Sequence, residues 1–318
     1  MTPRLVMVLS ENWVITGPRD MRALVRMAVE AEQEGIDAVQ VSEHVVLGPS
    51  AGASGVMENP RDYAYPGNQE PDMSWPSSLV LLSGVAAATE RLRLVAGAVI
   101  APLRHPLLLA KDLATLDLLA EGRLVVIPTV SWHEDQYAAL GVPFRRRGDI
   151  LDEQLDVLSR AWGPGPITHR GEHFAFDEVW VEPRAHRPDG PRMWFGGQHL
   201  HPRLLRRLVR YGHGFSPLGT PSDDDLRRLT EGLAAAGRSI DELELVGGIR
   251  GRFPDATSAA DLDEALEALP GRLAAGFTTI CFKPSMFIDD ARDLGRFCRT
   301  LVRKVAAIAP PAPPPQPP

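Results

Sequence analysis

Two adjacent polar residues, Glu43 and His44, stand directly after a predicted buried strand and could carry out proton-transfer chemistry. The strand covers Asp37 to Ser42 and ends where the polar pair begins. Histidine has the side-chain pKa nearest to neutral pH, so it can donate or accept a proton under physiological conditions. A histidine that merely caps a loop is the alternative interpretation of His44.

Two further regions could bind an anionic or carbonyl group. Arg104 precedes a predicted helix that begins at Leu107, and an arginine beside a helix N-terminus suits a phosphate or a ring carbonyl. Gly196, Gly197 and Gln198 open a later crossover, where bare backbone amides can approach a phosphate. A surface arginine and an ordinary tight turn would explain the same residues without a ligand.

Metal and hydrolase chemistry have weaker support. The segments His133-Glu134-Asp135 and His199-x-His201 contain metal-ligand residue types, but neither has a catalytic zinc spacing with a third ligand. No metal site is therefore predicted. The sequence has no Gly-x-Ser-x-Gly turn and no P-loop lysine, which argues against the simplest hydrolases and phosphoryl-transfer enzymes.

Composition narrows the possible partners. The 318 residues carry a formal net charge of -7, which argues against nucleic acid as the main partner. The longest apolar stretches fall far short of a membrane span. Cys281 and Cys298 have no metal-ligand spacing and are interpreted as reduced core thiols, which points to a cytoplasmic location.

The element that must position these residues is a strand-helix-strand unit in the middle of the chain. Arg91 to Ile100 and Gly122 to Ile127 are short apolar runs, and the helix Leu107 to Ala120 lies between them. This pattern is typical of a parallel sheet, in which a helix crosses over between neighbouring strands.

Similar units recur along the chain. Further strands are predicted at Arg4 to Ser10, Asp37 to Ser42, Pro191 to Phe195, Gly214 to Pro217, Leu243 to Gly248 and Thr278 to Phe282. Eight strands alternating with about eight helices, without a Gly-x-Gly-x-x-Gly turn after the first strand, favour an α/β fold of the closed (β/α)8 barrel type. We predict one domain over residues 1–308 and a disordered proline-rich tail over 309–318.

Two insertions interrupt the regular alternation. Val45 to Trp75 is rich in Gly, Pro, Asn and Asp and is interpreted as a loop that acts as a lid. Gly171 to Pro183 alternates apolar and polar residues and is predicted to form a two-stranded hairpin. One helix is predicted over Asp261 to Ala274.

Barrel enzymes carry their active sites beyond the carboxyl ends of the strands. That rule selects a set of candidate site residues, namely Ser10, Glu43, His44, Gly97, Ala98, Arg104, Ser131, Trp132, Gly196, Gly197, Ser216 and Lys283.

Longer motifs surround these candidates. They are Arg91-Leu-Arg-Leu, Pro102-Leu-Arg-His-Pro-Leu-Leu-Leu-Ala-Lys111, Ala114-Thr-Leu-Asp117, Gly122-Arg-Leu, Ala139-Leu-Gly-Val-Pro-Phe144, Trp194-Phe-Gly-Gly197 and Arg210-Tyr-Gly-His-Gly214. Together they resemble the bacterial-luciferase-like family of flavin and deazaflavin oxidoreductases. The resemblance implies a TIM barrel with a redox ring at its mouth and a non-prolyl cis peptide at Gly97-Ala98. A trans glycine that lets the strand end bend is the alternative.

The resemblance also implies roles for the candidate residues. It implies coenzyme F420 as cofactor, with FMN as the alternative, and a small organic substrate. His44 would donate or accept the substrate proton, and Glu43 would orient His44. Arg104 would contact the cofactor, Gly196, Gly197 and Gln198 would lie near its phosphate, and Trp132 would stack on the ring or wall the pocket.

One segment departs from the family pattern. Family members commonly have a glycine-rich end to the fourth strand, whereas this chain has Ile127-Pro128-Thr129-Val130-Ser131. Either Thr129 and Ser131 provide hydroxyl contacts in a reshaped pocket, or cofactor binding has weakened.

Three functions follow from the resemblance. The first is hydride transfer between F420 and a small molecule, and the second is an FMN monooxygenase that receives reduced flavin from a partner reductase and uses dioxygen. The third is a non-catalytic binding barrel. The family also implies a homodimer.

Overall fold

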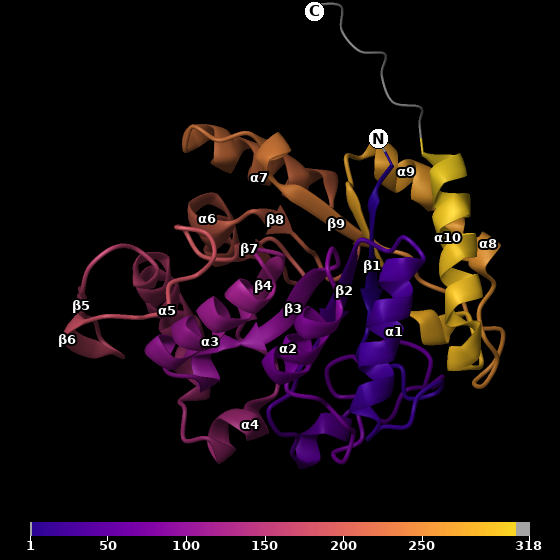
Figure 1. The fold of residues 1–318 in the computed structure, drawn as a ribbon, viewed down its shortest axis with the longest axis horizontal. Helices are drawn as coiled ribbons and strands as arrows, with labels where there is room; N and C mark the ends of the chain where they lie inside the picture. Colours follow the sequence, from indigo (N-terminus) through magenta and orange to yellow (C-terminus); the bar gives the residue numbers. More distant parts are fainter. Residues whose placement is uncertain (1, 310–318) are drawn as a thin grey trace, which may run out of the picture.

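Eight parallel strands form a closed barrel in the computed structural model, which describes residues 2–309 (Figure 1). Around the barrel the strands follow the order β1, β10, β9, β8, β7, β4, β3, β2. Their bounds are β1 Arg4–Val8, β2 Ala38–Val41, β3 Arg93–Ile100, β4 Leu124–Thr129, β7 Arg192–Phe195, β8 Gly214–Phe215, β9 Glu244–Gly248 and β10 Thr279–Phe282. The predicted (β/α)8 barrel is confirmed.

Alternate residues of the strands fill the barrel interior. Val6, Val95 and Trp194 belong to a buried apolar cluster at its centre. At the amino-terminal end of the barrel, the carboxylate of Glu244 accepts hydrogen bonds from both Nη atoms of Arg93, at 2.7 and 2.9 Å. Side chains therefore fill the middle and the amino-terminal end, as expected of a barrel whose chemistry lies at the opposite mouth.

Helices cover the outside of the barrel, and the one predicted over Leu107 to Ala120 is present as α3. Their bounds are α1 Met21–Gln33, α2 Ser78–Ala88, α3 Pro106–Leu119, α4 Glu134–Ala139, α5 Arg147–Ala161, α6 Pro202–Tyr211, α7 Asp223–Ala235, α8 Leu262–Leu266, α9 Leu269–Ala274 and α10 Leu294–Ile308. The single helix predicted over Asp261 to Ala274 is wrong, because the chain divides there into α8 and α9. Pro270 has no backbone N–H to continue a helix and instead stands in the first turn of α9.

The hairpin insertion exists, but its first strand lies earlier than predicted. Its strands are β5 Ile167–Arg170 and β6 Ala175–Val179, so Gly171 begins the turn rather than a strand. The carboxylate of Glu153 on α5 accepts hydrogen bonds from the backbone amides of turn residues 172–174 at 2.9 to 3.1 Å. This contact with a distant helix fixes the turn and was not visible in local alternation.

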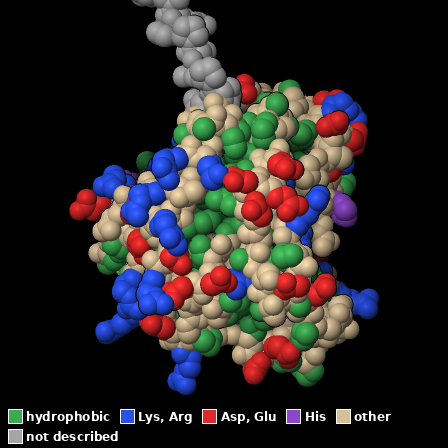
Figure 2. Space-filling view, turned by 90° about the vertical axis from the view of Figure 1, so that its right-hand side faces the viewer, with side chains coloured by type: hydrophobic (Ala, Val, Ile, Leu, Met, Phe, Trp, Pro, Cys, Tyr) green, Lys and Arg blue, Asp and Glu red, His purple; other side chains and the backbone are tan. Residues whose placement is uncertain are grey.

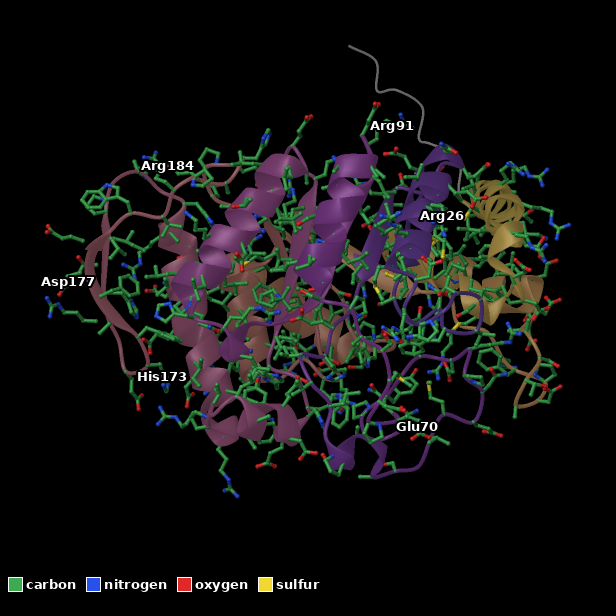
Figure 3. The ribbon with its side chains drawn as sticks, turned by 60° about the horizontal axis from the view of Figure 1, so that its bottom comes forward. Arg26, Glu70, Arg91, His173, Asp177 and Arg184 are labelled. Carbon is green, nitrogen blue, oxygen red and sulfur yellow. The ribbon has the colours of Figure 1, made fainter. Side chains whose placement is uncertain are left out.

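The long segment 45–75 is docked against the barrel. It lies on the side of α4, at the bottom of Figure 1, and Figure 3 brings that side forward with Glu70 labelled. The buried side chains of Asn59 and Arg61 donate hydrogen bonds to five backbone carbonyls across the mouth, those of Asp255, Thr257, Ser258, Ser285 and Ile288. The segment is therefore anchored by specific contacts at this point.

The remaining sequence predictions concern the membrane and the tail. Within residues 2–309, every helix is too short or too polar to span a bilayer. α10 ends at Ile308, and residues 310–318 of the predicted tail lie outside the described residues. The boundary predicted after residue 308 stays a prediction.

Candidate active site at the barrel mouth

The end of β3 forms one wall of the mouth. The peptide bond between Gly97 and Ala98 is cis, and the register between β3 and β4 shifts between Gly97 and Val99. A Cβ on Gly97 would lie 3.0 Å from both Gln40 Cδ and Ile127 Cδ1, so these two side chains pack directly against the bare backbone. The buried Oε1 of Gln40 has no hydrogen-bond partner within the described chain.

A row of aromatic rings crosses the mouth beside this wall. The ring centroids of Trp13 and Trp75 lie 5.3 Å apart, those of Trp75 and His44 lie 5.1 Å apart, and those of His44 and Trp132 lie 5.8 Å apart. His133 follows, with its centroid 4.8 Å from that of Trp132. Trp132 therefore belongs to the wall around His44.

His44 is a neutral imidazole at physiological pH. Burial among the rings, followed by the nearby His133, lowers the pKa of His44 to about 4. Its Nδ1 is buried and has no hydrogen-bond partner among residues 2–309. A neutral ring with an unsatisfied nitrogen can exchange a proton or a hydrogen bond with a bound molecule.

His133 contacts the docked segment at Gly48 and Ser50. Its Nε2 accepts a hydrogen bond from the amide of Gly48 at 2.8 Å, which assigns the ring proton to Nδ1, near the hydroxyl of Ser50 at 3.4 Å. Asp135 accepts hydrogen bonds from the amide and the hydroxyl of Ser50 at 2.9 and 2.8 Å. No cluster of potential metal ligands occurs in the described part of the chain.

Glu43 and Arg104 form a buried ion pair with each other. Both Nη atoms of Arg104 donate to the carboxylate of Glu43, at 2.8 and 3.0 Å. The same carboxylate accepts hydrogen bonds from the hydroxyl of Ser78 at 2.7 Å and the amide of Ile100 at 2.9 Å. The side chain of Glu43 is 2% exposed, so the pair joins the end of β2 to the β3–α3 connection and to α2.

These contacts change the interpretation of both residues. None of the hydrogen bonds in the described chain joins Glu43 to His44, so the orienting role predicted for Glu43 has no direct contact to carry it. The guanidinium of Arg104 is occupied by Glu43. Sequence position alone placed both residues at the mouth but could not show that they pair across 61 positions.

At the end of β4, the hydroxyl of Ser131 is engaged within the chain. Ser131 has a positive φ of 57°, and its Oγ accepts a hydrogen bond from Gln136 Nε2 at 2.9 Å. Thr129 is the last residue of β4 and pairs in register with Ile100. Contacts of Thr129 or Ser131 with a cofactor stay predictions.

The turn after β7 has a structural need for its first glycine. A Cβ on Gly196 would lie 1.7 Å from the carbonyl oxygen of Ser216, so no other residue fits without moving the end of β8. Among the described residues, the backbone amides of Gly197 and Gln198 donate no backbone hydrogen bond. The amide of Gly196 donates none either, so all three amides remain available to an anion.

A second polar cluster faces the mouth from β1 and β10, and sequence analysis missed most of it. Lys283 follows β10 and is fully buried, while Glu11 follows β1 and is 6% exposed. Burial lowers the pKa of Lys283 to about 8 and raises that of Glu11. Tyr63 of the docked segment completes the cluster, with Lys283 Nζ 5.5 Å from its ring centroid. Only Lys283 was selected from the sequence, by its place after a strand.

The fold and the mouth define a luciferase-like barrel of the flavin- and F420-dependent oxidoreductase kind. The model of the luciferase-like monooxygenase family matches residues 2–278. The chain therefore belongs to this family.

Sequence relatives cover part of the chain. An uncharacterized protein of Mycobacterium tuberculosis is 33% identical over 162 residues, which are 50% of this chain and 56% of that protein. The pyrimidine monooxygenase RutA of Pantoea ananatis is 36% identical over 112 residues, which are 34% of this chain and 31% of RutA. The matches thus span little more than half of the relatives' own length, or less.

Solved structures share the fold over nearly the whole chain. An F420-dependent secondary alcohol dehydrogenase has a TM-score of 0.71 at 13% identity and covers 98% of this chain and 100% of its own. The monooxygenase RslO1 of Streptomyces bottropensis has a TM-score of 0.69 at 18% identity and covers 96% and 99%. At these identities the likeness concerns the fold alone.

The residues at the mouth fit a flat redox ring. Gln40 and Ile127 cover Gly97 at the cis peptide, whereas the partly exposed Ala98 presents only a methyl group to the mouth. Gln40 Oε1 and His44 Nδ1 are each buried without a hydrogen-bond partner in the described chain, so each could bond to a heteroaromatic ring or its substrate. Trp75 and Trp132 supply apolar walls beside them.

Proposed function

We propose that the protein is an F420-dependent oxidoreductase that transfers a hydride between the deazaflavin C5 and a small organic substrate. The observation that carries this proposal is the neutral His44, with its unpartnered Nδ1, in an aromatic wall at the barrel mouth. Family membership supports the class of cofactor, and the F420-dependent alcohol dehydrogenase among the structural neighbours supports F420.

His44 moves the proton that accompanies the hydride. With a pKa near 4, its ring is unprotonated at neutral pH and can accept the hydroxyl proton of an alcohol as the carbonyl forms. The protonated form needed for the reverse step is scarce at that pH. Bound F420 would accept the hydride, so the chain itself needs only to orient the alcohol and take its proton.

Other residues hold the cofactor and exclude water. We infer that the cis peptide at Gly97 and Ala98 supports the ring, Trp132 walls it, and the amides of Gly197 and Gln198 face its phosphate. Arg104 acts indirectly in this scheme, because its pairing with Glu43 fixes the backbone of Ile100 just beyond the cis bond.

An FMN monooxygenase is the second candidate. It is favoured by the match to the pyrimidine monooxygenase RutA over one third of the chain. In that function a partner reductase would supply reduced FMN, and dioxygen would be consumed with the substrate. A non-catalytic barrel is the third candidate, motivated by Ile127 and Pro128 at the end of β4, where the family pattern has glycines.

Anaerobic turnover separates these candidates. Purified protein should reduce F420 without dioxygen in the presence of a small secondary alcohol such as 2-propanol or lactate, and His44→Phe should slow the reaction by at least about 10²-fold. Turnover that requires FMN, a reductase and dioxygen would favour the monooxygenase. Absence of both reactions, with neither cofactor bound, would leave the binding barrel.

We also propose a homodimer through α2 and α3. α2 has no charged residue from Ser78 to Ala88, and Val80 on α2 and Leu108 and Leu119 on α3 are 73%, 66% and 51% exposed. The face over α10 is less suitable, because Figure 2 shows Lys, Arg, Asp and Glu side chains spread across it. Sedimentation should give a dimer for the wild type and a monomer for Val80→Glu/Leu108→Glu.

A cytoplasmic location completes the proposal. Cys281 and Cys298 are both free thiols, as expected in a reducing compartment.

A further inference from the structure

Lys283 points into the mouth of the barrel from the end of β10. Val6 and Cys281 are paired in register and both face the barrel interior. Because strand side chains alternate, the residue two positions after Cys281 faces the interior as well, one layer closer to the mouth. The ammonium of Lys283 thus lies beneath the docked segment, with no exposed surface.

Protein groups satisfy this ammonium only in part. Nζ donates one hydrogen bond, to the carbonyl oxygen of Asp62 at 2.5 Å. The ring centroids of Trp13 and Tyr63 lie 5.6 and 5.5 Å from Nζ, and the carboxylates of Glu11 and Asp62 act on it through their charge alone. An ammonium has three N–H donors, so two of them have no acceptor among the described residues.

Nearby carboxylates accept hydrogen bonds from other donors and not from Lys283. The carboxylate of Asp62 is engaged by Arg250 Nη2 at 2.9 Å, and Glu11 Oε2 accepts the amide of Ala64 at 3.2 Å. Lys283 forms none of the ion pairs within residues 2–309. Burial lowers the pKa of Lys283 to about 8, because it outweighs the charges of Glu11 and Asp62, which still favour the ammonium form.

We infer that Lys283 binds a small oxyanion, and that this oxyanion is a carboxylate group of the substrate. A carboxylate would accept the two free N–H groups and form the direct ion pair that Glu11 and Asp62 do not form with Lys283. Trp13 links the sites, because its ring lies against Lys283 on one side and Trp75, the neighbour of His44, on the other. The assignment to a substrate rests on the function proposed above, which makes the substrate class a small hydroxy or oxo acid.

The scarcity of lysine makes a direct test practical. The chain contains three lysines, Lys111, Lys283 and Lys304, so protein labelled with [ε-13C]lysine gives three side-chain signals. Sodium acetate and acetamide have the same size but differ in charge. Titration of the cofactor-free protein with each probe, at constant ionic strength, reports anion binding at each lysine separately.

We expect acetate, and not acetamide, to shift the Lys283 signal and to raise its measured pKa. An anion that binds only the ammonium form should raise this pKa by about 1 when its concentration is ten times its Kd. The signals of Lys111 and Lys304, which lie on the exterior, should not respond. Equal responses to acetate and acetamide, or no response at Lys283, would overturn the inference.

Two variants complete the test. Lys283→Met should lose one signal and weaken acetate binding at least about tenfold, whereas Lys283→Arg should retain most of it because the charge remains. If Lys283→Met does not fold, the contrast between the two probes in the wild type still decides. These titrations contain no cofactor, so a negative result contradicts only anion binding at Lys283. Failure to bind F420 is measured separately and would contradict the proposed function.

Discussion

The two sides of the barrel mouth differ in how their buried polar groups are compensated. On the side of β2 to β4, Glu43 and Arg104 neutralise each other, and the functional group, His44, is kept uncharged by aromatic rings. On the side of β1 and β10, Lys283 carries a charge that no carboxylate pairs. The first side is therefore suited to proton exchange and the second to anion binding. The segment 45–75 contacts both sides, through Gly48 and Ser50 on one and Asn59 and Arg61 on the other.

The strongest way to break this comparison is to remove His44. His44→Phe keeps the aromatic wall but removes the proton acceptor, so we expect turnover to fall by roughly 10²- to 10⁴-fold. Affinity for the cofactor should change little, as measured by fluorescence titration. Lost cofactor binding with normal turnover of the bound fraction would contradict the role of His44.

Breaking the ion pair should affect stability rather than chemistry. Arg104→Met leaves the 2% exposed carboxylate of Glu43 without its partner, at a cost of roughly 3 kcal/mol in the free energy of unfolding, measured by urea denaturation. Arg227→Met removes an exposed pair on α7 and serves as the control, with an unfolding midpoint close to that of the wild type. If the Arg104→Met protein is stable but cannot bind the cofactor, Arg104 contacts the cofactor directly, as predicted from the sequence.

The two sides should also differ in the pH range where they affect stability. His44 has a pKa of about 4 in the folded chain and an ordinary value of 6.5, so the unfolded chain binds the additional proton between these values. The free energy of unfolding should therefore fall by up to about 3 kcal/mol as the pH drops from 6.5 to 4, and His44→Phe should remove this loss.

Lys283 should also make the free energy of unfolding increase with pH, but in an alkaline range. Its pKa is about 8 when folded against an ordinary 10.5, so stability should rise as the pH increases between these values. Lys283→Met should flatten that rise and leave the acid window unchanged. The assignment would be contradicted if Lys283→Met changed the pH dependence of stability in the acid range and His44→Phe changed it in the alkaline range.

The smallest effect concerns the docked segment. A Cβ on Gly48 would lie 2.4 Å from Asp135 Oδ2, so Gly48→Ala should displace the hydrogen bonds to His133 and Asp135. We expect faster amide hydrogen exchange at residues 48–52 and unchanged exchange around Arg61. Faster exchange at both ends would show that the segment opens as one unit.

The barrel was predictable because its signals are local. Apolar runs such as Leu94 to Ile100 define strands, and the rule that chemistry follows strand ends placed His44, Gly97 and Lys283 at the mouth. The cis bond at Gly97 was implied by family motifs, and the structure contains it.

The pairings within the site were not predictable, because they join distant segments. Glu43 meets Arg104 across 61 positions, and Lys283 meets the carbonyl of Asp62 across 221. Tyr63 and Glu11 carry no motif, and a loop tyrosine acquires its place only when Arg61 docks the segment. Sequence spacing within one element cannot report such contacts.

The most direct measurement is a parallel titration of the cofactor-free protein with F420 and FMN, followed by cofactor fluorescence. We expect saturable binding of F420 in the micromolar range or tighter and weaker binding of FMN, with the Gly97→Val variant losing affinity because its side chain would meet Gln40 and Ile127. Failure of the wild-type protein to bind either cofactor would contradict the assignment of a redox ring to this mouth.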